Sequence, residues 1–284
     1  MSAPPEFRLD QRRVSVARDA AAVWRVLEED PIGSCMVAAR VADHGVDPRS
    51  IGGELWTRGG GVDESLCYAG ANLIPLRGAP ADLTAFADKA VGAIRRCSSL
   101  VGRAELVLPM WQRLADSWGP ARDVRESQPL MALHTMPACP MDAEVRQVRP
   151  DELDAYLVAA VDMFIGEVGV DPRAGDGGRA YRRRVANLIA SGRAWARFER
   201  GEVVFKAEVG SQSPAVGQIQ GVWVHPDRRG RGLGAGGTAM LAAVIVGTGR
   251  IASLYVNDFN EVARSTYERV GFTQVGTFAT VLLD

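Results

Sequence analysis

The sequence predicts an α/β protein with a mixed, α+β-type sheet, divided into two domains near residue 140. A length of 284 residues is comfortable for two domains. Hydrophobic residues make up 47% and charged residues 24%, which is an ordinary globular composition. Pro137, Pro140 and Pro150 lie close together, and prolines discourage helix continuation. We therefore expect an N-terminal α/β domain of unknown function over residues 1–140 and a second domain over residues 141–284.

The N-terminal part alternates between strand-like and helix-like segments. Apolar residues recur at helical spacing in residues 82–94 and again in residues 104–118. Strands are expected on either side of these helices, at residues 65–76, 98–101 and 128–133. This order predicts a small sheet with two covering helices.

The C-terminal part has a clearer pattern. We expect, in order, helices at 151–168 and 178–191, strands at 193–198, 203–209 and 218–224, a helix at 233–246, a strand at 251–256, a helix at 260–270 and a strand region at 272–283. The order α-α-β-β-β-α-β-α-β indicates a mixed sheet with helices on its faces, not an unbroken βαβ series.

Composition excludes several classes of protein. A formal net charge of −1 argues against a nucleic-acid binder. The N-terminus has no apolar signal region and no apolar run reaches a membrane span, so we expect a cytoplasmic protein with no membrane partner. The four cysteines lack the paired spacing of a zinc site, and no metal is expected: Cys35, Cys67, Cys97 and Cys139. The oligomeric state, monomer or homodimer, is left open.

A glycine-rich turn between a strand and a helix is the sharpest feature of the sequence. The strand ends at Val222, Trp223 and Val224, and the helix follows within ten residues. Glycine lets the backbone approach a ligand closely, and amides at a helix N-terminus bind pyrophosphate. The candidate pyrophosphate-binding residues form one continuous stretch: Arg229, Gly230, Arg231, Gly232, Leu233, Gly234 and Ala235.

A second motif occupies residues 254–272. Asn260 is a natural N-cap for a helix, and Gly271 suits the position just after the helix ends. Asn260, Arg264 and Tyr267 are three or four residues apart, so they share one helical face.

Both segments resemble signatures of the GCN5-related N-acetyltransferase (GNAT) superfamily. Residues 229–234 fit the pattern R/Q-x-x-G-x-G/A, and residues 254–272 fit L-x-V-x-x-x-N-x-x-A-x-x-x-Y-x-x-x-G-F. The whole chain resembles a bacterial GNAT group with an extra N-terminal domain. The resemblance implies a GNAT fold at 141–284 and acetyl-CoA as cosubstrate, and we hypothesise that the N-terminal domain is a degenerate GNAT-like copy.

The resemblance also implies site roles. The diphosphate of acetyl-CoA would lie on the amides of residues 229–235, and its pantetheine arm would pair with Val222–Val224. Asn260 would contact the pantetheine arm or the sulfur region, and Tyr267 would lie by the thioester sulfur. Arg264 would either touch a phosphate or be solvated.

The implied reaction is acetyl transfer to a primary amine by direct attack in a ternary complex. Tyr267 would protonate the departing thiolate, and a backbone N–H near Trp223 or Val224 would stabilise the oxyanion. The general base stays open between Glu208, His225 and a water chain. Glu167 and Asp171 could attract a cationic amine or form a solvated acidic loop.

Two other functions fit parts of the pattern. One is an acyl-CoA-binding regulatory protein without turnover. The other is a dinucleotide-dependent enzyme, because G-x-G-x-x-A also occurs at 230–235 and Asp258 follows the next strand. In the dinucleotide-binding fingerprint the glycines follow the strand directly, whereas residues 225–229 separate them here. This spacing argues against a dinucleotide-binding site.

Overall fold

The computed structural model describes residues 13–59 and 61–284. The N-terminal segment, on which the expectation of no secretory signal rests, lies outside the described residues. The chain forms two compact units. The first contains the residues up to Leu130 together with 255–259 and 274–284, and the second contains 131–254 and 260–273. The units therefore do not coincide with one cut at residue 140, because the C-terminal strand joins the first unit.

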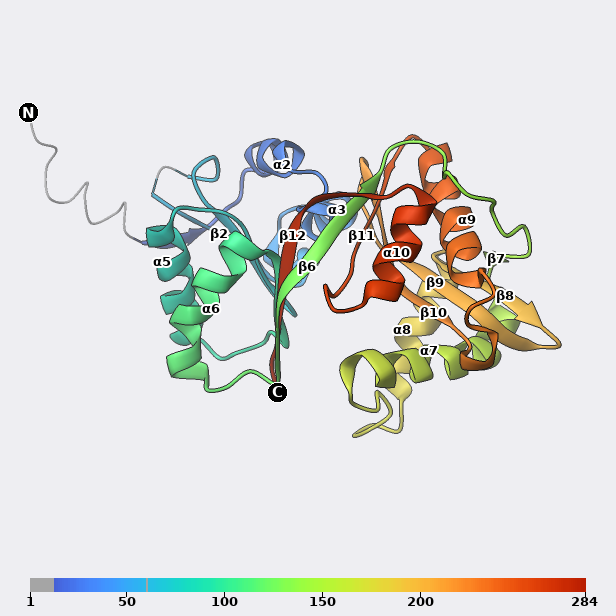
Figure 1. Cartoon of the computed structure of the whole chain (residues 1–284). Helices are drawn as coiled ribbons and strands as arrows, with labels where there is room; N and C mark the ends of the chain where they lie inside the picture. Colours follow the sequence, from blue (N-terminus) through green and yellow to red (C-terminus); the bar gives the residue numbers. More distant parts are fainter. Residues whose placement is uncertain (1–12, 60) are drawn as a thin grey trace, which may run out of the picture. The chain divides into compact units, whose positions relative to one another are not determined.

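The first unit is built around an antiparallel-rich sheet whose strands follow the order β1-β2-β3-β4-β5-β12-β6. Its elements, several of which are labelled in Figure 1, are β1 (Val14–Val16), α2 (Ala20–Glu29), α3 (Cys35–His44), α4 (Pro48–Ile51), β2 (Glu54–Arg58), β3 (Leu66–Ala69), β4 (Leu73–Arg77), α5 (Pro80–Val91), β5 (Ser99–Arg103), α6 (Ala104–Trp118), β6 (Asp123–Leu133) and β12 (Thr273–Leu282). Strands β6 and β12 each have an end in the second unit.

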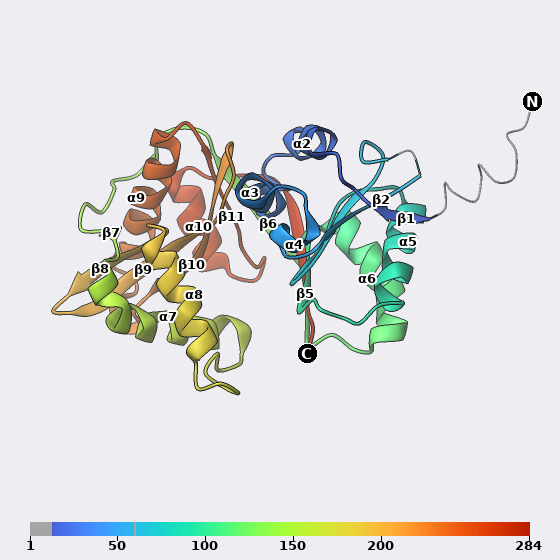
Figure 2. The same ribbon diagram turned by 180° about the vertical axis from the view of Figure 1, so that it is seen from behind.

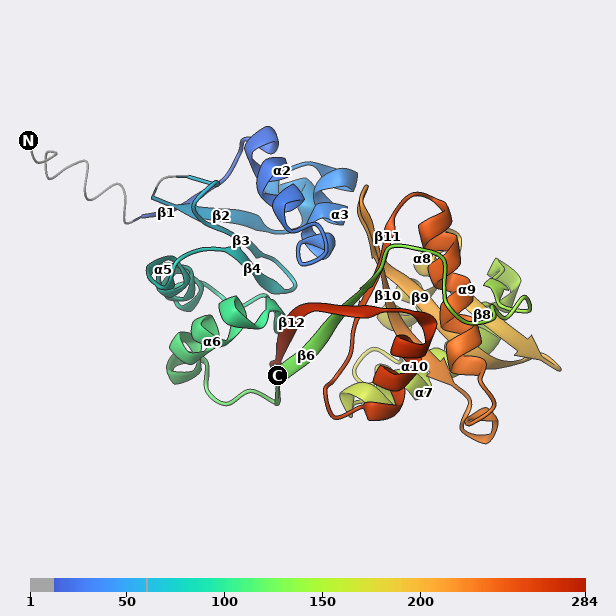
Figure 3. The ribbon, with the colours of Figure 1, turned by 45° about the horizontal axis from the view of Figure 1, so that its top comes forward.

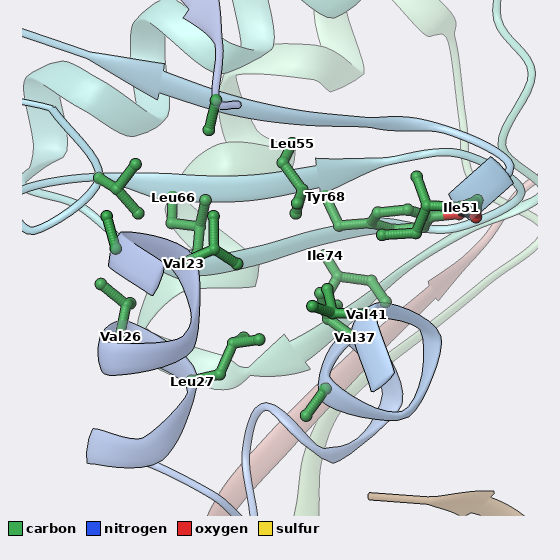
Figure 4. Close-up of a cluster of buried hydrophobic side chains, with 14 of the residues drawn as sticks. Val23, Val26, Leu27, Val37, Val41, Ile51, Leu55, Leu66, Tyr68 and Ile74 are labelled. Carbon is green, nitrogen blue, oxygen red and sulfur yellow. Dashed lines mark hydrogen bonds between the residues drawn. The ribbon is translucent and has the colours of Figure 1, made fainter. Parts of the chain in front are cut away.

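Helices cover both faces of this sheet. Along β2, Leu55 belongs to the core under α2, α3 and α4, whereas Trp56 belongs to the core under α5 and α6. Side chains of neighbouring strand residues point to opposite faces, so one strand serves both cores. Figure 3 shows the two helix layers on either side of β1–β4. Figure 4 shows Leu55, Leu66 and Ile74 facing the apolar side chains of α2 and α3.

In the N-terminal part, the predicted helices and strands have the correct type, but several of them begin or end at other residues than predicted. Residues 65–76, predicted as one strand, form the hairpin β3–β4, because Gly70 donates its amide to the Asn72 carbonyl and turns the chain (3.0 Å). Helix α5 begins at Pro80 and ends before Ile94, which is 89% exposed. Helices α2 and α3 were not predicted, and a central sheet is present.

The second unit has the strand order β6-β11-β10-β9-β8-β7. Its elements are β7 (Arg146–Gln147), the 3₁₀ turn η1 (Pro150–Glu152), α7 (Leu153–Val168), α8 (Arg179–Ala190), β8 (Ala194–Glu199), β9 (Glu202–Gln212), β10 (Val216–Val224), the 3₁₀ turn η2 (Pro226–Arg228), α9 (Leu233–Gly247), β11 (Ile251–Tyr255) and α10 (Glu261–Val270). From β7 to β10 each strand pairs antiparallel with the next strand in the chain, whereas β10 pairs parallel with β11. The predicted α/β class with a mixed sheet is confirmed.

Helices cover this second sheet on both faces as well. Tyr156 of α7 and Val185 of α8 share one buried cluster with strand residues of β8 and β9; Figure 2 shows these helices in front of the sheet. Helix α9 packs on the face that carries Phe205. A Cβ at Gly237 would lie 2.5 Å from the Phe205 ring, so only glycine lets α9 approach β9 this closely.

Candidate active site

Strand β10 has an open edge along its second half. It pairs with β11 only from Val216 to Gln218, opposite Ile251 to Ser253. Beyond Gln218, no pairing with β11 occurs in the described part of the chain. The amide of His225 donates to the Val204 carbonyl of β9 (3.0 Å). Because strand residues alternate between the two edges, Trp223 also faces β9, whereas the amides of Val222 and Val224 point to the open edge.

A bulge interrupts β10 just before these residues. Gln220 pairs with Glu208 and Trp223 pairs with Lys206, so β10 carries one extra residue over this stretch. Gly221 takes a left-handed conformation there, with φ +59°. Bulges bend a strand and re-aim the groups that follow, which here are the amides at the open edge.

The glycine turn leads from β10 into α9. Gly230 and Gly232 have φ values of +73° and +81°, and no protein atom lies within 4 Å of the position that a Cβ would take at either. Among the described residues, the amides of 230–235 have no hydrogen-bond partner, whereas Arg229 donates its amide to the Pro226 carbonyl (3.3 Å). The turn therefore presents unpaired donors beside open space, at the positive end of a helix.

Basic side chains flank the turn but are partly engaged. The Arg229 guanidinium donates to the Val224 carbonyl at the end of β10 (3.3 Å). Arg228 lies 3.4 Å from Glu199 on β8. Arg231 is exposed on the turn itself. Among the described residues, the Arg229 amide is thus the one predicted diphosphate donor at 229–235 that already makes a hydrogen bond within the protein.

Helix α10 lies against the turn. Gly234 of α9 would bring a Cβ to 3.6 Å from Val224 and 3.8 Å from Thr266, so strand, turn and α10 meet at this glycine. Asn260 caps α10 as predicted, because its side-chain oxygen accepts the Ala263 amide (3.1 Å). Its side-chain NH₂ group remains as a donor. Arg264 follows on the same helix, one turn further on.

Tyr267 is buried in the second unit, at 8% exposure, with its ring edge-on to Phe272. In the described residues its hydroxyl makes no hydrogen bond. Burial, and next the carboxylate of Glu167 at the end of α7, raise the pKa of Tyr267 above its ordinary value. The phenol is therefore neutral at pH 7 and still carries its proton.

Glu208 lies in a buried network rather than on an accessible surface. Its side chain is 1% exposed and lies 3.0 Å from the Lys206 ammonium and 3.6 Å from Arg184. Tyr156 and Gln220 each donate a hydrogen bond to its carboxylate (3.3 Å for both). Burial alone would raise the pKa of Glu208, but these cations and hydrogen bonds lower it overall. In this environment the Glu208 carboxylate is better suited to be a fixed counter-ion than a base that takes a proton directly from the acceptor amine.

Lys206 was not singled out from the sequence, although a signal was available. It is one of only two lysines in the chain, and it interrupts the apolar run at residues 203–207. Gly221 inside a strand was a second signal, because a glycine there often marks a bulge.

His225, a candidate general base, and Asp171, a candidate for attracting the amine, have distinct surroundings. His225 and Trp223, with ring centroids 5.8 Å apart, line a pocket of about 270 Å³ beside Ala159 and Asp162 of α7. The His225 ring accepts the Asp227 amide (3.3 Å). Asp171 is held by Arg173 in the loop after α7 (2.8 Å), and that hydrogen bonding lowers its pKa.

Residues 13–59 and 61–284 contain neither a cluster of metal-binding side chains nor a helix that could span a membrane. No group of three or more His, Cys, Asp or Glu side chains is arranged to hold a metal ion there. No helix in that part of the chain has the length and apolar character needed to cross a bilayer.

Comparisons with known proteins relate two segments of the chain to families. Residues 206–281 match the family described as FR47-like protein, and residues 53–156 match a domain of unknown function, DUF4081. No curated protein gives a significant match.

Solved structures show the fold. A Drosophila protein superposes with a TM-score of 0.66 at 12% identity, covering 95% of this chain and 98% of that one. A GNAT-family acetyltransferase from Colwellia psychrerythraea gives 0.58 at 12% identity, covering 96% and 100%. A GCN5-related N-acetyltransferase from Kribbella flavida gives 0.51 at 17% identity, covering 87% and 95%. The chain is therefore a GNAT-fold protein, in which an FR47-like segment follows an additional N-terminal domain.

Proposed function

We propose that the protein is an acetyl-CoA-dependent N-acetyltransferase that moves an acetyl group to a primary amine by direct attack in a ternary complex. One observation carries this proposal. The open edge of β10 runs directly into a turn whose amides, at residues 230–235, have no partner among the described residues. An extended pantetheine arm, with a thioester at one end and a diphosphate at the other, matches that order of donors.

The residues fit acetyl-CoA in a definite direction. The diphosphate lies on the amides of Gly230 to Ala235, with Arg231 supplying charge. The pantetheine arm pairs with the open edge at Val222 and Val224. Asn260 offers its side-chain NH₂ to the arm, and Arg264 lies on the same face of α10. The absence of protein atoms near Gly230 and Gly232 leaves room for phosphate oxygens.

The chemistry follows from the same residues. An alkyl amine has a pKa near ~10.4 and must lose a proton before it attacks the thioester carbonyl. Because Glu208 is buried and ion-paired, we assign this proton transfer to a water chain, with Glu208 at most at its far end. The amide of Val222 faces the open edge and stabilises the oxyanion. Tyr267 then gives its proton to the departing thiolate.

The test is release of CoA when acetyl-CoA is offered with a panel of amines: small amines, aminoglycosides, peptides with free N-termini and a lysine-rich protein. Mass spectrometry of the acceptor must show the added acetyl group. Calorimetry with acetyl-CoA and with NAD(P) distinguishes the dinucleotide alternative. Tight binding of acetyl-CoA without turnover on any amine would favour an acyl-CoA-binding regulatory protein. Absence of acetyl-CoA binding would refute the proposal.

A further inference from the structure

Lys206 is a fully buried lysine beside the β10 bulge. It is 0% exposed and sits on β9, directly opposite Trp223. Its ammonium donates to the Gly221 carbonyl at 3.0 Å and pairs with Glu208 at 3.0 Å. Burying a charge costs several kcal/mol unless it is paired and hydrogen-bonded. A simple core position would be filled at lower cost by an apolar side chain, so the contacts of this ammonium need an explanation.

The Gly221 carbonyl is the unusual group that Lys206 holds. Residue 221 has φ +59°, and its carbonyl accepts a hydrogen bond from the Lys206 ammonium. A Cβ there would lie 3.0 Å from the Met163 sulfur and 3.1 Å from the Lys206 ammonium. The bulge is thus fixed on one side by tight packing and on the other by this hydrogen bond.

The neighbours of Lys206 allow the charge to stay in the core. Glu208 neutralises it, and Glu208 is itself held by Tyr156 and Gln220 at 3.3 Å each. The ammonium also lies 5.4 Å from the centre of the Tyr156 ring, a cation–π contact. The lysine therefore cannot move away from Gly221 without leaving a buried carboxylate poorly compensated.

We propose that Lys206 is a positioning residue: by holding the Gly221 carbonyl it fixes the bulge that aims the Val222 amide at the thioester carbonyl of bound acetyl-CoA. This inference rests on the proposed function, because it assigns a role within that site. We call the hydrogen bond from Lys206 to the Gly221 carbonyl the clamp, and Glu208 is the counter-ion that keeps it in place. The Gly221 carbonyl and the Val222 N–H belong to one planar peptide group, so any rotation of that peptide redirects the Val222 amide.

The test uses the full chain and needs no acceptor. The variant Lys206→Met with Glu208→Gln removes the clamp without leaving a buried charge unpaired, and such replacements are often tolerated. Gly221→Ala disturbs the same carbonyl while both charged residues stay. Tyr156→Phe is the matched control, since it removes a hydrogen bond to Glu208 but does not touch Gly221. Each protein is mixed with acetyl-CoA carrying ¹³C at its carbonyl, and the carbonyl stretch is measured by infrared spectroscopy.

In the wild type and in Tyr156→Phe we expect the stretch to move to lower frequency than in buffer, because the Val222 amide donates to the carbonyl. In the double variant and in Gly221→Ala we expect the shift to be lost, with the Kd for CoA unchanged within about twofold. With a productive amine, kcat should fall by about 100-fold at unchanged KM for acetyl-CoA, the cost of a ~1 Å misplacement.

An unchanged band shift in the double variant or in Gly221→Ala would overturn the role of Lys206 while leaving the acetyltransferase proposal intact. So would bound acetyl-CoA whose carbonyl band does not move in the wild type. Failure of the wild type to bind acetyl-CoA at all is a different result, and it would remove the proposed function together with this inference.

Discussion

Replacing Gly232 by valine should strongly weaken binding of acetyl-CoA at a modest cost in stability. Gly232 has φ +81° in the turn before α9, and the space where its Cβ would lie is free of protein atoms. Gly249 offers a matched control on the same unit, because its φ is +80° and its Cβ space is equally free. It follows α9, at the end away from the turn. The two substitutions therefore place valine at nearly the same left-handed φ, and only one lies in the candidate site.

The magnitudes separate the two variants. A left-handed conformation costs a residue with a side chain about 1–2 kcal/mol, so both Gly232→Val and Gly249→Val should lower the free energy of unfolding by at least this amount. At Gly232 the side chain also fills the phosphate space and turns amides away. Loss of two hydrogen bonds to a charged group, at about 1.5–3 kcal/mol each, weakens binding by about 100-fold or more.

Thermal or denaturant unfolding gives the stability of each variant, and titration calorimetry gives its Kd for acetyl-CoA. We expect similar stability losses and a binding loss confined to Gly232→Val. Wild-type affinity for acetyl-CoA in Gly232→Val would refute the assignment of the turn to the diphosphate. An equal loss of affinity in both would show that strain alone, not position, controls binding.

Three further predictions follow from single contacts. Tyr267→Phe should lower kcat with acetyl-CoA affinity and stability nearly unchanged, since the hydroxyl has no partner in the described residues; unchanged turnover in steady-state assays would remove it as the acid. Gly237→Ala should destabilise the fold by about 1–3 kcal/mol in denaturant unfolding, because its Cβ meets a ring at 2.5 Å, whereas Gly247→Ala at the open end of α9 should not destabilise it. The pKa of Glu152 is lowered to about 2, chiefly by its hydrogen bond from Arg146. A lowered pKa stabilises the fold above the unfolded value near ~4.3, so Glu152→Gln should lose stability at pH 7, and its difference from wild type should vanish as pH falls toward 2 in pH-dependent unfolding.

The sequence was most informative where periodicity and capping are local. The helix over residues 260–270 was predicted from Asn260 and Gly271, and the structure confirms both caps, with Gly271 left-handed at φ +111°. The glycine turn was equally visible, because a strand, three glycines and a helix follow one another without long-range help. The N-terminal helix α2 was missed although Asp19 caps it and Val23, Val26 and Leu27 form its apolar face.

The features that the sequence did not reveal depend on residues far apart in the chain. The bulge at Gly221 is defined by the register of β9 against β10. Apart from Lys206 on the same strand, the partners of Glu208 come from α7, α8 and β10, so its burial and lowered pKa could not be predicted from β9 alone. The return of β12 to the first unit likewise depends on its pairing with β5. Phe278 lies opposite Arg103, which is more than 170 residues earlier in the sequence.

A crystal structure of the protein with CoA tests the central claim most directly. We predict that the diphosphate lies within hydrogen-bond distance of the amides of residues 230–235, with the pantetheine arm along the open edge of β10 at Val222 and Val224. A diphosphate bound elsewhere, or a turn whose amides bond to other protein atoms in the complex, would contradict the account.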